Sequence, residues 1–196
     1  MALIVIGVLL LVVIISVVGV YNKLVAFKNR YQIAFAQIEV QLKRRYDLIP
    51  NLVETVKGYM AHERETLEAV IAARNQAVSG LQAAAGDPGD PNAIQKLATA
   101  EGVLGGAMSR LFALAEAYPD LKASENMKQL TEELTSTENK VSFARQAFND
   151  AVTAYNTFKQ SFPAVVFVGL FGHAQDASLL EFDSQAIAEA PKVSFS

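Results

Sequence analysis

The first twenty residues contain no charged side chain, and no other feature of the sequence limits the fold as strongly. From Ala2 to Val20 the chain consists of aliphatic residues and glycine, interrupted only by Ser16. At a rise of about 1.5 Å per residue, about twenty residues cross a hydrocarbon core of roughly 30 Å. The segment therefore predicts a transmembrane helix over residues 2–20. The side chains expected to contact lipid include Ala2, Leu3, Ile4, Leu10 and Val20.

A cleaved signal peptide is the alternative interpretation of this segment. Signal peptides usually begin with basic residues and end at a small-residue cleavage site. Residues 1–3 carry no basic side chain, and residues 16–20 (SVVGV) form a poor cleavage site. The apolar run is also longer than the apolar region of a usual signal peptide. We therefore favour an uncleaved anchor.

The charges that follow the span indicate its orientation. Lys23, Lys28 and Arg30 lie just beyond the apolar segment, and Glu39 is the single acid between residues 21 and 46. Basic residues next to a span favour the cytoplasmic side of the membrane. We therefore expect the N-terminus outside and the rest of the chain in the cytoplasm, with a periplasmic location as the alternative.

The composition excludes several classes of site. The chain of 196 residues has no cysteine, so it has no disulfide, thiolate metal site or cysteine nucleophile. Its two histidines, His62 and His173, leave little material for histidine-based metal or catalytic sites. The formal net charge of −3 and the lack of a basic run interleaved with aromatic residues argue against nucleic-acid binding.

Apolar residues after Val20 recur with helical spacing. The clearest repeat has a period of seven residues and consists of Met127, Leu134, Val141, Phe148 and Tyr155. Such a pattern is typical of long helices packed lengthwise against one another. We therefore predict an all-α fold in which an antiparallel four-helix bundle follows the anchor. The helices are expected at about 2–47, 50–79, 92–118 and 122–160.

Proline and glycine set the expected helix ends. Pro50 disfavours a helical conformation at Ile49 and suits the first turn of a new helix, so a break is expected there. Residues 80–92 (GLQAAAGDPGDPN) contain two Asp-Pro steps and predict a turn-rich loop. No proline separates the anchor from the first bundle helix, which predicts one continuous helix of about 45 residues, roughly 68 Å long.

A second apolar segment follows Pro163. Residues 164–172 (AVVFVGLFG) carry no charge but are too short to span a bilayer as a helix. We favour a segment folded back on the bundle. An oligomer contact or a second contact with the membrane surface is the alternative, because exposed apolar patches usually have a partner. The candidate contact residues are Val166, Phe167, Leu170 and Phe171.

The chain is thus expected to contain an anchor at residues 1–20, a helical bundle at 21–172 and a loosely ordered tail at 173–196. No catalytic site is visible in it. Glu63 and Glu101 fall on apolar seam positions, and together with His62 they form a low-ranked metal-site hypothesis. Since a buried carboxylate is costly unless paired, we favour pairing with an arginine such as Arg74 or Arg110.

The densest charge cluster is formed by Lys43, Arg44 and Arg45. Its simplest interpretation is a solvated helix end, where basic groups complement the helix dipole. The alternative is a docking surface for an acidic partner or for lipid headgroups, although the expected distance from the bilayer disfavours headgroups.

Several sequence motifs point to a known family. They are QIxVQLKRR at 37–45, DLIPNLVETVKGY at 47–59, YPxLKA at 118–123, TEN at 137–139, FP at 162–163 and FG at 171–172. These motifs resemble those of the LemA family, and the resemblance covers residues 21–172. Two departures are visible: Phe35 stands where the family commonly has Trp, and the chain from His173 onward lacks the family's usual Lys- and Tyr-containing tail.

The resemblance implies a bacterial membrane protein with one N-terminal span and a long-helix bundle, and it implies neither catalysis nor a cofactor. We therefore expect a non-enzymatic scaffold or adaptor of the bacterial envelope, located in the inner membrane. It would contact lipid through residues 2–20, form a homo-oligomer and meet a protein partner in the membrane. The alternatives are a metal- or ligand-binding sensor bundle and an accessory subunit of a membrane protease or sensor kinase.

Overall fold

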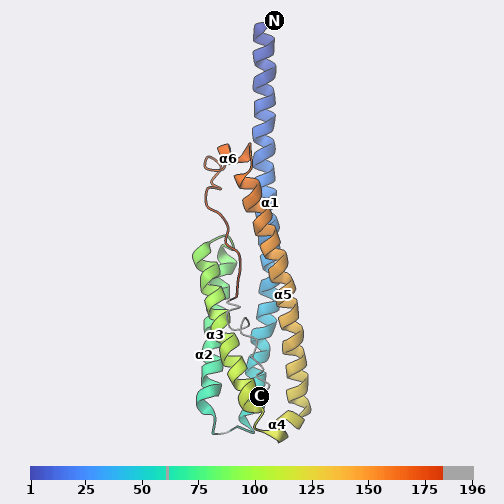
Figure 1. Ribbon diagram of the computed structural model, residues 1–196, viewed down its shortest axis with the longest axis vertical. Coiled ribbons are helices and arrows are strands. Elements are labelled where there is room, and N and C mark those ends of the chain that lie inside the picture. The colour runs from blue at the N-terminus through green and yellow to red at the C-terminus, as the bar shows by residue number, and fades with distance from the viewer. Residues whose placement is uncertain (61, 183–196) are drawn as a thin grey trace, which may run out of the picture.

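Four long helices dominate the computed structural model, which describes residues 1–60 and 62–182. The long helices are α1 (Ala2–Lys57), α2 (Arg64–Gly86), α3 (Pro91–Ala115) and α5 (Glu125–Gln160), and the short helices are α4 (Pro119–Ala123) and α6 (Ala164–Phe167). Figure 1 shows α5 alongside α1, and α2 and α3 as a hairpin beside the end of α1 farthest from the N-terminus. Successive long helices run antiparallel, so the predicted all-α bundle is confirmed over these residues.

The seven-residue repeat of α5 forms its buried face, as its spacing predicts. All five repeat residues from Met127 to Tyr155 are buried. Aromatic rings from this face meet rings of α1 at centroid distances of 5.5 Å for Phe35 and Phe148 and 5.3 Å for Tyr31 and Tyr155. Edge-to-face aromatic pairs of this kind add to the free energy gained by burying apolar area. The α1–α5 pair is therefore a lengthwise seam.

The anchor and the first bundle helix form one helix, but the expected break at Pro50 is wrong. Pro50 lies inside α1, which continues to Lys57. A proline has no N–H, so it leaves the carbonyl of the residue four positions earlier, Tyr46, without its helical partner. Arg74 of α2 donates a hydrogen bond from Nε to this carbonyl at 3.2 Å. A side chain from the neighbouring helix thus replaces the backbone bond that the proline removes.

The chain reverses direction between Lys57 and Arg64, and α2 begins at Arg64 instead of near residue 50. α2 then continues through the alanine-rich stretch to Gly86, well into the expected loop, because alanine is the strongest helix former. Only residues 87–90 connect α2 to α3. Asp90 caps α3 by accepting hydrogen bonds from the N–H groups of Asn92 and Ala93.

Gly80 explains how closely α2 and α3 pack. A Cβ at this position would lie 3.2 Å from the Cα of Leu97 on α3. Even an alanine at this position would require the backbone of α3 to move by a few tenths of an ångström. The α2–α3 hairpin is built on this close approach.

The chain after α6 is ordered against α5 over residues 173–182, although the sequence places these residues in a loosely ordered tail. The Asn156 side chain donates to the Ala177 carbonyl at 2.8 Å and accepts from the Ala177 N–H at 3.0 Å. Asn149 makes the same pair of hydrogen bonds with Leu180, at 3.2 and 2.9 Å. Two asparagines of α5 therefore bind this extended segment through its backbone, which apolar patterning does not reveal. Residues 183–196 of the expected tail lie outside the described residues.

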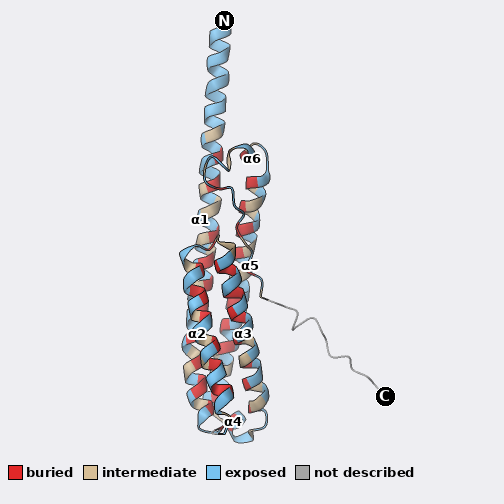
Figure 2. Ribbon diagram, turned by 90° about the vertical axis from the view of Figure 1, so that its left-hand side faces the viewer, coloured by how far each residue is buried: buried red, intermediate tan, exposed pale blue. Residues whose placement is uncertain are grey.

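Burial divides α1 into two parts (Figure 2). Residues 2–16 are exposed on every face of the helix, whereas from Leu24 onward a stripe of buried residues faces α5 and α2. The same unbroken helix therefore supplies a free apolar rod and a bundle element, and it places the candidate functional surfaces at defined heights along its axis.

Candidate functional site

The apolar rod at the start of α1 is long and apolar enough to cross a membrane. The predicted lipid-contacting residues Ala2, Leu3, Ile4 and Leu10 are exposed, and Val20 is buried where the bundle begins. The Ser16 hydroxyl donates to the Val12 carbonyl at 2.8 Å, so the single polar side chain of the rod is satisfied within the helix. Such internal satisfaction is what a hydrocarbon environment requires. The chain thus carries a single-pass anchor at its N-terminal end.

The second candidate surface is the apolar loop, defined as residues 162–172, which includes α6. Its inner side packs on the bundle: Ala164 is buried, and the Phe171 ring meets the Tyr21 ring of α1 edge-on at 5.2 Å. Phe167 and Phe171 are stacked with centroids 6.2 Å apart. Its outer side is free, with Val166 and Leu170 exposed. The loop is folded back on the bundle and still presents an apolar surface.

The basic cluster at residues 43–45 does not act as a single surface. Lys43 and Arg44 are exposed, and Lys43 pairs with Glu39 one helical turn earlier. Arg45 points the other way and is buried. The contact surface expected from three bases is therefore reduced to Lys43 and Arg44. Arg45 follows Ile38 and Leu42 at the spacing of the buried stripe of α1. This spacing could have predicted that Arg45 is buried while Lys43 and Arg44 are exposed.

Arg45 is the centre of a buried polar cluster that joins three helices. Its guanidinium Nη1 lies 2.9 Å from Oε2 of Glu101 on α3 and 3.1 Å from Oε2 of Glu138 on α5. The Tyr46 hydroxyl donates to the other carboxylate oxygen of Glu101. Pairing of Glu101 with an arginine was expected, but the partner is Arg45: Arg74 serves the Tyr46 carbonyl instead, and Arg110 is exposed.

Burial dominates the electrostatics of this cluster. Desolvation raises the pKa of the Glu101 carboxyl, against the opposing effects of the Arg45 charge and the Tyr46 hydrogen bond. Desolvation and the neighbouring Glu101 charge also raise the pKa of the Tyr46 hydroxyl far above its usual value. Both groups have defined partners on other side chains, so the arrangement is suited to fixing helix register.

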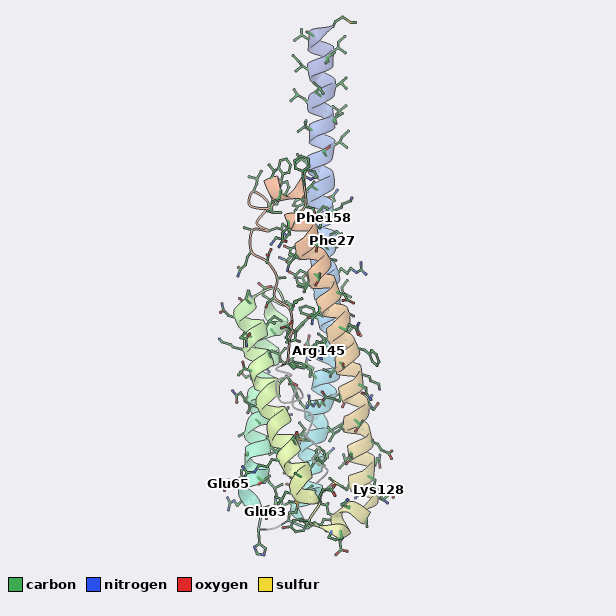
Figure 3. All side chains as sticks on the ribbon, viewed as in Figure 1. Phe27, Glu63, Glu65, Lys128, Arg145 and Phe158 are labelled. Atoms are coloured by element: carbon green, nitrogen blue, oxygen red, sulfur yellow. The ribbon has the colours of Figure 1, made fainter. Side chains whose placement is uncertain are left out.

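The residues of the metal-site hypothesis lie apart. Glu63 is at the end of the bundle farthest from the N-terminus, as Figure 3 shows, and it accepts a 3.5 Å hydrogen bond from the Tyr118 hydroxyl. His62 is exposed in the same turn, whereas Glu101 is held by Arg45 inside the bundle. Among residues 1–60 and 62–182, no group of three or more His, Asp or Glu side chains is placed to hold a metal ion.

A groove of about 810 Å³ lies between the C-terminal part of α1 and the start of α2. Val53, Met60, Leu67 and Ile71 form its apolar lining, and charged side chains including Arg64 surround it. The sequence gave no sign of a groove at this place, because the turn between the first two helices was expected near Pro50 and not between Lys57 and Arg64.

The sequence matches the LemA family over residues 34–195. It is 27% identical to the magnetosome protein MamQ of Magnetospirillum gryphiswaldense over 73% of this chain and 58% of that protein. It is 28% identical to magnetosome protein MamQ 2 of Paramagnetospirillum magneticum over 69% of this chain and 56% of that protein. It is also 27% identical to the protein LemA of Metamycoplasma hominis over 71% of this chain and 59% of that protein.

The chain thus spans less than two thirds of the length of the curated relatives it matches. The family match itself begins in the middle of α1 and includes every later helix of the bundle. The motifs noted in the sequence, from residue 37 to residue 172, all fall within the matched residues. This protein, with its membrane-anchored helical bundle, belongs to the LemA family.

Proposed function

We propose that this protein is a non-enzymatic scaffold of the bacterial envelope that holds its bundle at a fixed height above the inner membrane. The observation that supports this proposal is the continuity of α1, which runs for 56 residues from the free apolar rod into the core of the bundle. A helix of this length transmits position and orientation, whereas a flexible linker would not. The mechanism is geometric, because many copies anchored in the same way would present their bundles in register.

Self-assembly through the outer faces of the bundle is the second part of the proposal. Ile33 and Val40 on α1 and Phe143 on α5 are large apolar side chains that are more than half exposed. Exposed apolar residues on neighbouring helices supply contact area for a second copy. Lys43 and Arg44 would bind an acidic partner at the same level of the stalk.

Disulfide crosslinking in native membranes tests self-assembly directly, because the chain has no cysteine of its own. Single variants Val40→Cys and Phe143→Cys should form crosslinked dimers on mild oxidation, while the matched variant Thr99→Cys, exposed on α3, should not. Light scattering of the intact chain in mild detergent should give a mass above that of a monomer. A monodisperse monomer that forms no crosslink at either position would contradict self-assembly.

The orientation of the bundle is also proposed to be cytoplasmic. Lys23 and Arg30, which are exposed, and Lys28 follow the span directly, and flanking bases favour the cytoplasmic side. The same Thr99→Cys variant in intact cells should resist a membrane-impermeant maleimide until the membrane is permeabilised. Labelling before permeabilisation would place the bundle on the periplasmic side.

A ligand-binding sensor bundle is a second candidate function, and the groove between α1 and α2 favours it. Its lining is mainly apolar with a charged rim, which suits a small amphipathic molecule. Native mass spectrometry of the purified chain should then detect a bound small molecule that is lost in a Leu67→Arg variant. An identical mass spectrum for the two proteins, apart from the substitution, would remove this candidate.

A further inference from the structure

The apolar loop has two sides of different character. Its inner side is covered by the bundle, with Ala164 buried and Phe171 packed on Tyr21. Its outer side carries Phe162 at 84% and Leu170 at 81% exposure, with the more moderately exposed Val165 and Val166 between them. No residue from 162 to 172 is charged. A loop with so much exposed apolar surface and no charge is poorly suited to water.

The position of the loop along α1 identifies its surroundings. If the membrane begins near Ala2, a hydrocarbon core of roughly 30 Å ends about twenty residues later, next to Tyr21. Tyr21 is the residue that contacts Phe171. Val17 is half-buried and Val20 is buried, which shows that covering of the rod begins within its last turns. Figure 1 likewise places α6 beside α1 where the free rod emerges from the bundle.

The residues around this level match a membrane–water boundary. Tyr21 is partly exposed directly after the apolar segment, and tyrosine is enriched at such boundaries. Lys23 lies one half-turn further, with its Nζ 5.9 Å from the centre of the Phe158 ring. Figure 3 shows Phe158 and Phe27 just below the loop, on the bundle side. Along α1 from the rod toward the bundle, the surface is therefore first apolar, then aromatic and then basic.

We propose that the apolar loop inserts into the interfacial layer of the same membrane that α1 spans, so that the bundle contacts lipid at a second place. The occupant of its outer surface is lipid, because this surface is continuous with the lipid-facing rod. Phe162, Val166 and Leu170 enter the headgroup and upper acyl region, while Phe171 connects the loop to α1. A single helix leaves rotation about its own axis free, and the second contact removes this freedom. This property extends the proposed scaffold but does not depend on it.

Depth-dependent fluorescence quenching tests the insertion. Membrane partitioning of the whole chain cannot report on the loop, because α1 holds the chain in the bilayer. The chain contains no tryptophan, so one substitution creates a unique probe. Phe162→Trp and Leu170→Trp place the probe in the loop, and Val103→Trp provides the control, since Val103 is exposed on α3, outside both the loop and the proposed contact face. Each full-length variant is reconstituted in phosphatidylcholine and phosphatidylglycerol vesicles with or without lipids brominated near the top of the acyl chain.

The loop probes should lose more than half of their emission in brominated vesicles and should emit at shorter wavelength than the control, which should lose less than a tenth. Two loop probes are used because one of the variants could fold poorly, which circular dichroism would reveal. The other probe would then still report on the loop. Quenching of the loop probes no stronger than that of Val103→Trp would overturn the proposal. Protection of the loop probes from aqueous iodide without quenching by brominated lipid would also overturn it, and would assign the surface to a second copy of the chain.

Discussion

Each of the two parts of α1 carries a polar side chain that needs a hydrogen-bonding or charged partner, and each part finds that partner in a different place. The free rod, residues 2–16, is apolar on every face, and its Ser16 hydroxyl is satisfied by a carbonyl of its own helix. The bundle part buries a full charge at Arg45, satisfied by carboxylates from two other helices. A polar side chain on a rod surrounded by lipid can hydrogen-bond only to the backbone of its own helix. A polar side chain inside a bundle can also bind groups on the neighbouring helices. α1 thus passes from one environment to the other as a single continuous helix.

Removing Arg45 should produce the largest loss of stability. In Arg45→Leu the Glu101 carboxylate, whose side chain is 2% exposed, loses its counter-charge. Breaking a buried pair from one side costs about 3–5 kcal/mol. Because burial already raises the pKa of Glu101, its protonated form is favoured in the fold, and the variant should lose further stability as pH rises. Urea unfolding of the full chain in detergent, followed by circular dichroism between pH 5 and 8, measures both effects.

Glu138→Ala is the control for Arg45→Leu. The Glu138 side chain is 54% exposed, so its pairing with Arg45 resembles a surface salt bridge worth about 0–1 kcal/mol. If Glu138→Ala lost as much free energy of unfolding as Arg45→Leu, the partly exposed Arg45–Glu138 pair, and not the buried Arg45–Glu101 pair, would be the main source of stability in this cluster.

Placing a charge on either part of α1 tests whether the two parts face different solvents. Leu10 and Val40 are exposed to nearly the same degree, 59% and 57%. Leu10→Arg should lower membrane insertion by about 2.5–3.5 kcal/mol, because a charge near the centre of a span is costly. Val40→Arg should change the free energy of unfolding by less than about 0.5 kcal/mol, as on a water-exposed surface.

Carbonate extraction of membranes measures the retained fraction of each variant. Equal retention of Leu10→Arg and Val40→Arg would contradict the assignment of the rod to lipid.

A smaller loss of stability is expected when the hydrogen bond that compensates for Pro50 inside α1 is removed. Arg74→Met removes the donor to the Tyr46 carbonyl and should cost about 1–3 kcal/mol, the usual penalty for an unsatisfied buried polar group. Pro50→Ala restores a backbone N–H at the position where the helix would normally supply it. The double variant should therefore recover most of the loss caused by Arg74→Met. Additive losses in the double-mutant cycle would show that Arg74 stabilises the bundle by another route.

The smallest effect is expected at the segment after the apolar loop. The His173 ring accepts or donates a 2.7 Å hydrogen bond with the Tyr155 hydroxyl, and burial together with Lys28 and Lys159 lowers its pKa. The folded state therefore disfavours the charged ring, and stability from this group is present above pH about 6.5 and lost as pH falls below it. The neighbouring Asp176 is paired with Lys159 at 2.7 Å and does not offset the charge on the ring.

Amide hydrogen exchange at Ala177 and Leu180 measures this change, because both amides are held by α5 side chains. Their protection should fall between pH 7 and 5.5 in the unaltered chain and stay constant in His173→Gln. A parallel decrease in both proteins would assign the pH response to another group.

The anchor, the buried face of α5 and the continuity of α1 could all be predicted from local sequence pattern. The charge-free opening segment gave the anchor, because a helix in lipid must be apolar all round and nothing else in the chain is. The seven-residue repeat gave the buried face of α5, because side chains spaced in this way share one side of a helix. The lack of proline between residues 20 and 49 gave the continuity of the rod with the bundle. Each of these depends only on neighbours along the chain.

Which side chains meet across helices, by contrast, could not be predicted before the helices were packed together. Pro50 indicates a break when its own segment is considered alone, and Arg74, 24 positions later in the sequence, cancels it by bonding to the freed carbonyl. The sequence favours an arginine as the partner of Glu101, but only the packing shows that this arginine is Arg45 of α1 and neither Arg74 nor Arg110. The same holds for the apolar loop, whose composition leaves its partner open until Phe171 is found against Tyr21 at the end of the anchor. Partners that are distant in sequence leave no local periodicity, and so the packed bundle alone specifies them.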